Sequence, residues 1–510
     1  MLPGSRSNPI SEFESDPCFS KYTLVVRAIF LHILSLAFMA WIEEAWPANL
    51  QPADCPDGVD PEAVRCATLQ VPENYSEPDG RSIDLYLTIV PAVQANEAWV
   101  PLAILAGGPG NSIAGEAGWY LEEGRDWRLE RPLILLDQRG TGFSNPLHCP
   151  RIEAQGSLEN DYASDLVEAC REQLSGKNDL RHFGTREAAQ DLDRVREALG
   201  YEQIDLWGIS YGTILAQAYL RAFPTRVRSA VLVGTALLDS RFPLYHASNA
   251  QRALDLLFFE CQSDPACSAA YPDLRDDWQK LLNRLDRDPP EVTLQREGGE
   301  PWMGALGRGI FAEDFRGLLG STGNTRRVPW IIHEAANDNF APLLEALAGP
   351  PDDFFSYGLY LSVTCAEATA RIESAQIEPA VMGTFLGDYR VREQIAACSA
   401  WPRAELAKEF FQPVISDVPV LLLVGEMDAT TPPMWSYQVA RGLSQGTVVS
   451  MPYGGHLFWD WGENQQGSEC FDNLALAFYA SGDAQALDTS CAQNVVPPPF
   501  LVPGQPATRH

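Results

Sequence analysis

Basic residues are scarce in this chain of 510 residues. Lysine and arginine together number 37, against 68 aspartate and glutamate residues, so the formal net charge is −31 at pH 7. A surface of this sign repels nucleic-acid phosphates and anionic lipid headgroups. We therefore expect no nucleic-acid partner and no stable membrane partner.

The start of the chain lacks an apolar stretch long enough for a membrane span. Its apolar run Ala28–Ile42 is shorter than the about 20 residues that a spanning helix needs. A basic flank containing Lys21 and Arg27 precedes the run, and small residues follow it. This order is typical of a secretory signal, with an uncleaved anchor as the alternative. We predict cleavage near Ala45 or Ala48 and a secreted or periplasmic location.

Cysteine spacing typical of metal sites is also absent. None of the eleven cysteines forms a CxxC pair or lies near a histidine pair, so we expect no zinc or other metal. Without Cys18 in the leader, an even ten remain, which favours disulfides in an oxidising compartment over buried free thiols. Their connectivity cannot be deduced, but their order along the chain gives five sequential couples: Cys55/Cys66, Cys149/Cys170, Cys261/Cys267, Cys365/Cys398 and Cys470/Cys491.

The composition is that of a folded chain, with 45% apolar and 21% charged residues. The length suits about three domains or one elaborated α/β domain. The segment Ile83–Ile89 alternates apolar and polar residues, as a half-exposed strand does. Other short runs are almost wholly apolar, which is typical of strands buried in a parallel sheet. These runs are Leu102–Ala106, Leu133–Leu136, Ile204–Trp207, Ala230–Val233 and Val420–Val424.

Helical patterns lie between these strands. In Glu187–Leu199 the apolar residues share one face, with Thr185 as the expected N-terminal cap and Gly200 as the end. Strands that alternate with helices predict the α/β class, with a mostly parallel, doubly wound sheet.

The alternation stops after Leu238 and resumes at Val420, which indicates a helical insertion into one sheet. We therefore predict five parts. They are a leader (1–48), the first part of the core (49–238), a helical cap (239–414), the second part of the core (415–493) and a proline-rich tail (494–510) that is either an extended strap or disordered.

A nucleophile elbow is predicted at Gly208-Ile209-Ser210-Tyr211-Gly212, which fits G-x-S-x-G. The motif directly follows a predicted strand and leads into the predicted helix Thr213–Ala222. Its glycines permit a tight turn that exposes the serine hydroxyl. We therefore predict Ser210 as the nucleophile, with a plain glycine-rich turn as the alternative.

A serine nucleophile needs a base, and the chain has only seven histidines. His456 follows the predicted strand Thr447–Met451, where the order Ser, Asp, His places the base in this architecture. The acid should follow the preceding strand, where Asp428 is favoured over Glu426 because it lies further into the loop.

Backbone N–H groups should stabilise the oxyanion of the reaction. One belongs to Tyr211, the residue after the nucleophile. The other is predicted at Gly108, in the loop Gly107-Gly108-Pro109-Gly110 after an early strand. A phosphate-binding loop is the alternative, but the segment lacks the lysine of a P-loop.

Together these motifs resemble the prolyl aminopeptidase family of α/β hydrolases, and within it the secreted tripeptidyl-aminopeptidase-like branch. The resemblance spans residues 55–493 and implies a cap after the sixth core strand, cleavage behind the first residue or a short N-terminal peptide, and no cofactor. An exported esterase or amidase, or a non-catalytic protein on the same scaffold, are the alternatives. The matching blocks are Gly107–Gly110, Asp137–Ser144, Gly208–Thr213, Gly425–Asp428 and Gly455–His456.

An aminopeptidase must also bind the free α-ammonium group of its peptide substrate, and a carboxylate in the cap suits that role. Glu367 is the predicted partner because it lies in a mainly apolar stretch beside Cys365. Glu313 and Asp314 are the reserve candidates, and an ordinary salt bridge is the alternative role for Glu367.

Overall fold

The computed structural model describes residues 46–94, 96, 99–296, 301–348, 355–458, 460 and 465–504. Residues 49–510 form one unit. The predicted leader, with Cys18 and Ala45, lies outside the described residues except for positions 46–48. Among the described residues, no helix has both the length and the apolar character needed to cross a bilayer.

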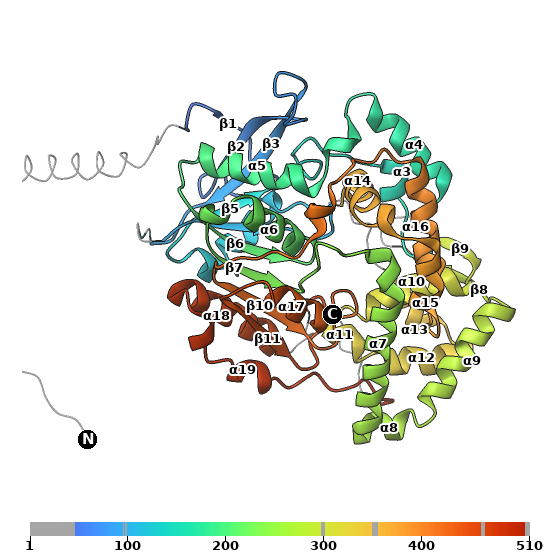
Figure 1. The fold of residues 1–510 in the computed structure, drawn as a ribbon. Coiled ribbons are helices and arrows are strands. Elements are labelled where there is room, and N and C mark those ends of the chain that lie inside the picture. The colour runs from blue at the N-terminus through green and yellow to red at the C-terminus, as the bar shows by residue number, and fades with distance from the viewer. Residues whose placement is uncertain are drawn as a thin grey trace, which may run out of the picture. The chain divides into compact units, whose positions relative to one another are not determined.

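A large mixed sheet forms the centre of this unit (Figure 1). Its strands are β1 (Leu50–Pro52), β2 (Arg65–Pro72), β3 (Ser82–Val90), β4 (Leu102–Leu105), β5 (Leu133–Leu136), β6 (Ile204–Ile209), β7 (Val227–Val233), β10 (Val420–Gly425) and β11 (Gly446–Met451). Their spatial order is β1-β2-β3-β5-β4-β6-β7-β10-β11. The pairs β1–β2, β2–β3 and β3–β5 are antiparallel, and the remaining pairs are parallel. Every strand predicted from an apolar run is present, so the predicted α/β class is confirmed.

Helices cover both faces of the sheet, which explains why its parallel strands are apolar throughout. They are α2 (Ala117–Leu121), α5 (Thr185–Ala198), α6 (Tyr211–Ala222), α17 (Pro433–Ala440), α18 (Gln466–Ser481) and α19 (Ser490–Gln493). Two further helices, α3 (Pro150–Glu153) and α4 (Ser164–Ser175), pack on each other, and α4 also packs on helices of the chain between β7 and β10. Helix α6 packs on β4, β6 and β7, and α17 packs on β10 and β11. Helix α18 contributes Phe471 and Leu474 to the cluster that includes Leu421 and Leu423 of β10.

The chain between β7 and β10 is mainly helical and gathers to one side of the sheet (Figure 1). Its elements are α7 (Phe242–Ser263), α8 (Pro265–Ala270), α9 (Leu274–Arg287), β8 (Glu291–Leu294), β9 (Trp302–Ala305), α10 (Arg308–Leu318), α11 (Thr322–Thr325), α12 (Val328–Ala336), α13 (Ala341–Leu347), α14 (Tyr357–Glu367), α15 (Ser374–Val381) and α16 (Tyr389–Ala400). Helices α7, α9, α10, α12 and α13 share an apolar cluster that includes Trp278, Phe311 and Phe315. We call this segment the cap and retain 239–414 as its proposed limits. It follows the seventh strand along the chain, one later than expected, because the sheet begins with the three-residue edge strand β1, which is too short to give a sequence signal.

The five sequential cysteine couples pair as disulfides. The prediction of disulfides is therefore confirmed, and the structure supplies the connectivity that the sequence left open. One of these disulfides, Cys365–Cys398, joins α14 to α16 inside the cap.

The described part of the tail is a strap between the core and the cap. Val495 is buried in the cluster of the sheet, and Phe500 is buried in the cluster of the cap. The backbone N–H of Leu501 donates to the carbonyl of Arg326 at 3.0 Å, and the hydroxyl of Tyr271 donates to the carbonyl of Leu501 at 2.8 Å.

Candidate active site

Ser210 lies in a tight turn between β6 and α6. Its backbone has φ 53° and ψ −119°, a conformation that is strained for a residue other than glycine. A Cβ at Gly212 would lie 2.0 Å from the carbonyl oxygen of Leu105, so only glycine fits there. The N–H of Ser210 donates to the carbonyl of Val233 at 2.9 Å, which fixes the turn against β7.

The structure brings Ser210, His456 and Asp428 together at the ends of three strands. His456 Nε2 lies 3.1 Å from Ser210 Oγ, and His456 Nδ1 lies 2.8 Å from Asp428 Oδ2. Asp428 is fully buried, whereas Glu426 is exposed and its carboxylate contacts Ser450. Of the two acids considered, only Asp428 therefore meets the histidine.

Two threonines hold the carboxylate of Asp428. Its Oδ1 accepts the backbone N–H groups of Thr430 and Thr431, each at 2.7 Å. The hydroxyl of Thr431 donates to Oδ2 at 2.8 Å and lies 3.1 Å from His456 Nδ1. A carboxylate only accepts hydrogen bonds, so this geometry favours the imidazole tautomer with its proton on Nδ1, which leaves Nε2 to accept the serine proton. The sequence analysis missed Thr431, and the only local signal for it was a Thr-Thr pair after the acid.

The cap holds the loop that carries His456. The N–H of Leu457 donates to the carbonyl of Gly320 at 2.8 Å. The hydroxyl of Thr322 accepts the N–H of Gly455 at 3.2 Å and donates to the carbonyl of Tyr453 at 3.0 Å. The position of the histidine therefore depends on a part of the chain more than a hundred residues away.

The loop with Gly108 lies directly against the serine turn. A Cβ at Gly107 would lie 3.3 Å from Ser210 Cβ, and Gly108 has φ +105°, which favours glycine. Tyr211 is the first residue of α6, where helical N–H groups have no partner within the helix. In the described part of the chain, neither Gly108 nor Tyr211 uses its backbone N–H in a hydrogen bond. Both groups can therefore serve a developing anion.

Glu367 ends α14 and caps α5. Its Oε1 accepts the N–H of Thr185 and its Oε2 accepts the hydroxyl of Thr185, each at 2.7 Å. The prediction that Thr185 caps this helix is wrong, because Gly184 is the N-cap residue and Thr185 is the first helical residue. The carboxylate of Glu367, from the cap segment, instead accepts hydrogen bonds at the N-terminus of α5, and both bonds are charge-assisted.

Glu367 also faces a cavity beside the serine turn. The cavity is small, with about 10 Å³ available to the centre of a water-sized group, and Pro109, Tyr211, Phe242 and Glu367 are among the residues that line it. Burial raises the pKa of Glu367 to about 7, although the two hydrogen bonds from Thr185 oppose the rise. At neutral pH this carboxyl group is therefore close to its titration midpoint.

The reserve carboxylates have other partners. Glu313 lies 2.7 Å from both Arg316 and Arg390. Burial opposes its charge, but the two guanidinium groups outweigh burial and lower the pKa of Glu313 to about 2. Asp314 accepts the N–H of Leu158 at 2.6 Å, and burial raises its pKa to about 7. In the part of the chain that the structure describes, no histidine, cysteine and carboxylate side chains gather in a group that could hold a metal ion.

Known proteins resemble this chain in two separate regions. Residues 101–266 match the family described as "alpha/beta hydrolase fold", and residues 383–491 match the family described as "TAP-like protein".

Similarity to individual proteins extends over most of the chain. Serine protease Hip1 of Mycobacterium tuberculosis is 24% identical over 476 residues, which cover 84% of this chain and 88% of that protein. A tripeptidyl aminopeptidase of Streptomyces lividans is 25% identical over 492 residues, with 86% of each chain covered. The solved structure of a proline iminopeptidase from Mycobacterium smegmatis aligns with 82% of this chain, at 16% identity and a TM-score of 0.39.

Proposed function

We propose that this α/β hydrolase, a serine peptidase with a TAP-like C-terminal segment, is an exported aminopeptidase. It removes an N-terminal residue, such as proline, or a short N-terminal peptide through Ser210, His456 and Asp428. The observation that carries this proposal is the unbroken series of contacts from Ser210 Oγ through both nitrogens of His456 to Asp428. The similarity to Hip1 and to the tripeptidyl aminopeptidase supports it.

The proposed reaction is acyl transfer. His456 Nε2 takes the proton of Ser210 as Oγ attacks the carbonyl carbon of the peptide bond. The N–H groups of Gly108 and Tyr211 hold the negative oxygen of the tetrahedral intermediate. The protonated His456 then donates to the leaving amine, and the acyl group stays on Ser210. A water molecule, deprotonated by His456, releases the acyl group and restores the serine hydroxyl.

Glu367 is the proposed partner of the substrate α-ammonium group. Support comes from its place on the cavity beside Tyr211 and Pro109, which belong to the two proposed oxyanion segments. Its carboxylate keeps acceptor capacity beyond the two bonds to Thr185. An ammonium group in that cavity also offsets the cost of burying the ionised carboxylate.

The export proposal rests on the signal-like start of the chain and on the five disulfides, which persist in oxidising compartments. Peptides with a free N-terminus are the proposed substrates, and no cofactor takes part in the proposed steps.

A panel of chromogenic substrates tests this function. It contains aminoacyl, dipeptidyl and tripeptidyl anilides, their N-acetylated forms, and short esters. We expect turnover of free-amine anilides, with Ser210→Ala and His456→Ala each lowering kcat by several orders of magnitude. The double variant should be little worse than either single one, because the residues act as a unit.

Two results would overturn the proposal. A preference of the wild type for N-acetylated anilides or esters would exclude an aminopeptidase. Near-normal turnover by Ser210→Ala would exclude Ser210 as the nucleophile.

A further inference from the structure

A block of polar residues after β5 is buried without a part in the proposed reaction. Asp137, Arg139, Thr141 and Ser144 are fully buried, and Gln138 is 5% exposed. Burying polar groups costs free energy unless each finds a partner. What these side chains bind therefore indicates why the block is there.

We define the oxyanion loop as residues 107–112. Asp137 binds the segment that directly follows this loop. Its Oδ1 accepts the N–H groups of Ile113 at 2.8 Å and Ala114 at 2.9 Å, and its Oδ2 accepts the N–H of Phe143 at 3.0 Å. Burial raises the pKa of Asp137, and the three N–H groups oppose that rise. A Cβ at Gly142 would lie 2.1 Å from Asp137 Oδ2, so glycine is required for this approach.

Gln138 binds the other end of the same loop. Its Nε2 donates to the carbonyl of Ala106, the residue before Gly107, at 3.2 Å. The hydroxyl of Ser144 donates to the carbonyl of Asp137 at 2.6 Å and accepts the N–H of Tyr86 in β3 at 2.7 Å. Two adjacent side chains thus hold both ends of the oxyanion loop and are themselves fixed to the sheet.

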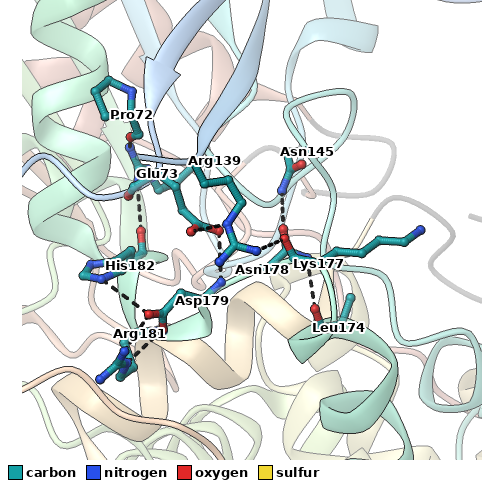
Figure 2. Close-up of polar contacts among 11 residues, drawn as sticks. Pro72, Glu73, Arg139, Asn145, Leu174, Lys177, Asn178, Asp179, Arg181 and His182 are labelled. Atoms are coloured by element: carbon teal, nitrogen blue, oxygen red, sulfur yellow. Dashed lines mark hydrogen bonds and ion pairs between the residues drawn. The ribbon is translucent and has the colours of Figure 1, made fainter. Parts of the chain in front are cut away.

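Arg139 fixes the block to its surroundings with all of its donors. It donates to both oxygens of Asp191 in α5, each at 2.6 Å. Its remaining N–H groups donate to the carbonyls of Glu73 at 2.8 Å, His182 at 2.7 Å and Pro72 at 3.4 Å. Figure 2 shows Arg139 with Glu73 and His182.

The end of β2 is held in turn by Glu73, whose carboxylate accepts from Asp179 N–H at 2.9 Å and Arg81 Nε at 2.8 Å. Figure 2 labels Glu73 and Asp179 together with Arg139. The residues near Arg139 therefore form a rigid base beneath Asp137 and Gln138 rather than a ligand site.

We infer that Asp137 and Gln138 are positioning residues that fix the Gly108 N–H relative to Ser210 before substrate arrives. A glycine-rich loop has many accessible conformations, and ordering it at each turnover would subtract from stabilisation of the transition state. Fixing the two ends removes that cost. This inference rests on the proposed function, because it assumes that Gly108 serves an oxyanion.

The test compares Asp137→Ala and Gln138→Leu with the wild type on one anilide substrate and two inhibitors. The first inhibitor is a peptidyl aldehyde, which forms a tetrahedral adduct with an oxyanion. The second is the matching alcohol, which forms none. We expect Asp137→Ala to lower kcat by about 100-fold with KM nearly unchanged, the scale of losing one oxyanion donor. The inhibition constant of the aldehyde should rise by a similar factor and that of the alcohol should stay constant.

Gln138→Leu keeps the inference falsifiable if Asp137→Ala fails to fold, because it removes one hydrogen bond. It should lower kcat and aldehyde affinity by about tenfold. Asp205→Asn is the matched control. Asp205 is a fully buried carboxylate that binds Arg131 and Ser229, and it lies at the start of β6, whereas Ser210 follows the end of that strand. This control should lower the melting temperature without a change in kcat.

Equal loss of aldehyde and alcohol affinity in the Asp137 and Gln138 variants, or unchanged kcat in both, would overturn the positioning role. Labelling of the wild type by a fluorophosphonate separates that failure from failure of the proposed function. If the wild-type protein is not labelled at Ser210, the proposed function itself fails.

Discussion

At the scale of single residues, Glu367 makes a structural contact that the sequence did not predict, and it also faces the cavity of its proposed role. It caps α5 through Thr185 and it faces the cavity beside Tyr211. The hydroxyl of Thr185 also lies 2.8 Å from the hydroxyl of Tyr211, so the cap carboxylate is linked to the residue after the nucleophile. A change in the charge of Glu367 should therefore affect stability and, through its proposed role, substrate binding.

We predict that Glu367→Gln raises KM for free-amine anilides by about tenfold, the scale of one charge-assisted contact, and leaves KM for N-acetylated substrates nearly unchanged. In the wild type, the carboxyl group is ionised above its pKa of about 7. Peptide α-amino groups lose their proton above about pH 8. The ratio of kcat/KM between free-amine and acetylated substrates should therefore peak near pH 7–8 and flatten in the variant.

Thermal stability gives an independent readout of the same group. Because the folded state raises the pKa of Glu367, its contribution to stability is largest below the unfolded value and is lost as pH rises through about 7. The melting temperature of Glu367→Gln relative to wild type should therefore improve from pH 5 to pH 8. Thr185→Val, which removes one bond to the carboxylate, is the control: it should lower stability and spare KM. An equal rise in KM on both substrate classes would leave Glu367 a structural role only.

At the scale of elements, the cap is joined to the catalytic loop and does not simply lie over it. Gly320, just before α11, supplies its carbonyl, and Thr322, the first residue of α11, supplies its hydroxyl; both hold the loop that carries His456. Thr322 is fully buried, so no water can take the place of its hydroxyl as the partner of the Gly455 N–H and the Tyr453 carbonyl. The cap segment is therefore part of the support of the proposed base.

We predict that Thr322→Val lowers kcat by about tenfold with little change in KM, because the Gly455 N–H and the Tyr453 carbonyl lose their partner. Thr322→Ser keeps the hydroxyl and should restore most of kcat. Thr325→Val is the matched control, since Thr325 is buried in the same helix and its hydroxyl donates to the carbonyl of Thr322. Steady-state kinetics and melting curves of the three variants check this. A loss of kcat in Thr325→Val equal to that in Thr322→Val would contradict the prediction.

At the scale of the whole unit, two apolar clusters are joined by the strap. Val495 belongs to the cluster of the sheet and Phe500 to the cluster of the cap. The guanidinium group of Arg326 lies 4.6 Å from the ring centroid of Phe500. The same guanidinium group lies 5.7 Å from the ring centroid of Tyr453, in the loop that carries His456. The end of the chain therefore stabilises the cap close to the segment that supports the histidine.

We predict that Phe500→Ala destabilises the protein by about 3 kcal/mol, the lower end for a buried phenylalanine, and lowers its melting temperature by roughly 3 °C. Val496→Ala is the control, because Val496 is 61% exposed and its truncation removes little buried area. Differential scanning calorimetry measures both. Equal melting temperatures for the two variants would show that the strap contributes nothing to stability.

Local patterns in the sequence were sufficient for much of this structure. Short apolar runs identified the buried strands, because a strand covered on both faces carries apolar residues at nearly every position. The glycines around Ser210 and the order of Asp428 and His456 after two later strands identified the three residues that meet. The cysteine couples were visible because partners close in sequence meet without a long loop to close.

Tertiary structure decided what no local pattern encodes. The bonds of Glu367 to Thr185 join residues 182 positions apart, and the bond of Thr322 to Gly455 joins residues 133 apart. Which carboxylate pairs with guanidinium groups, as Glu313 does with Arg316 and Arg390, depends on packing between helices of the cap. Sequence determines which residues can ionise or donate, whereas burial and the partners that the fold brings within 3 Å determine what each of them does.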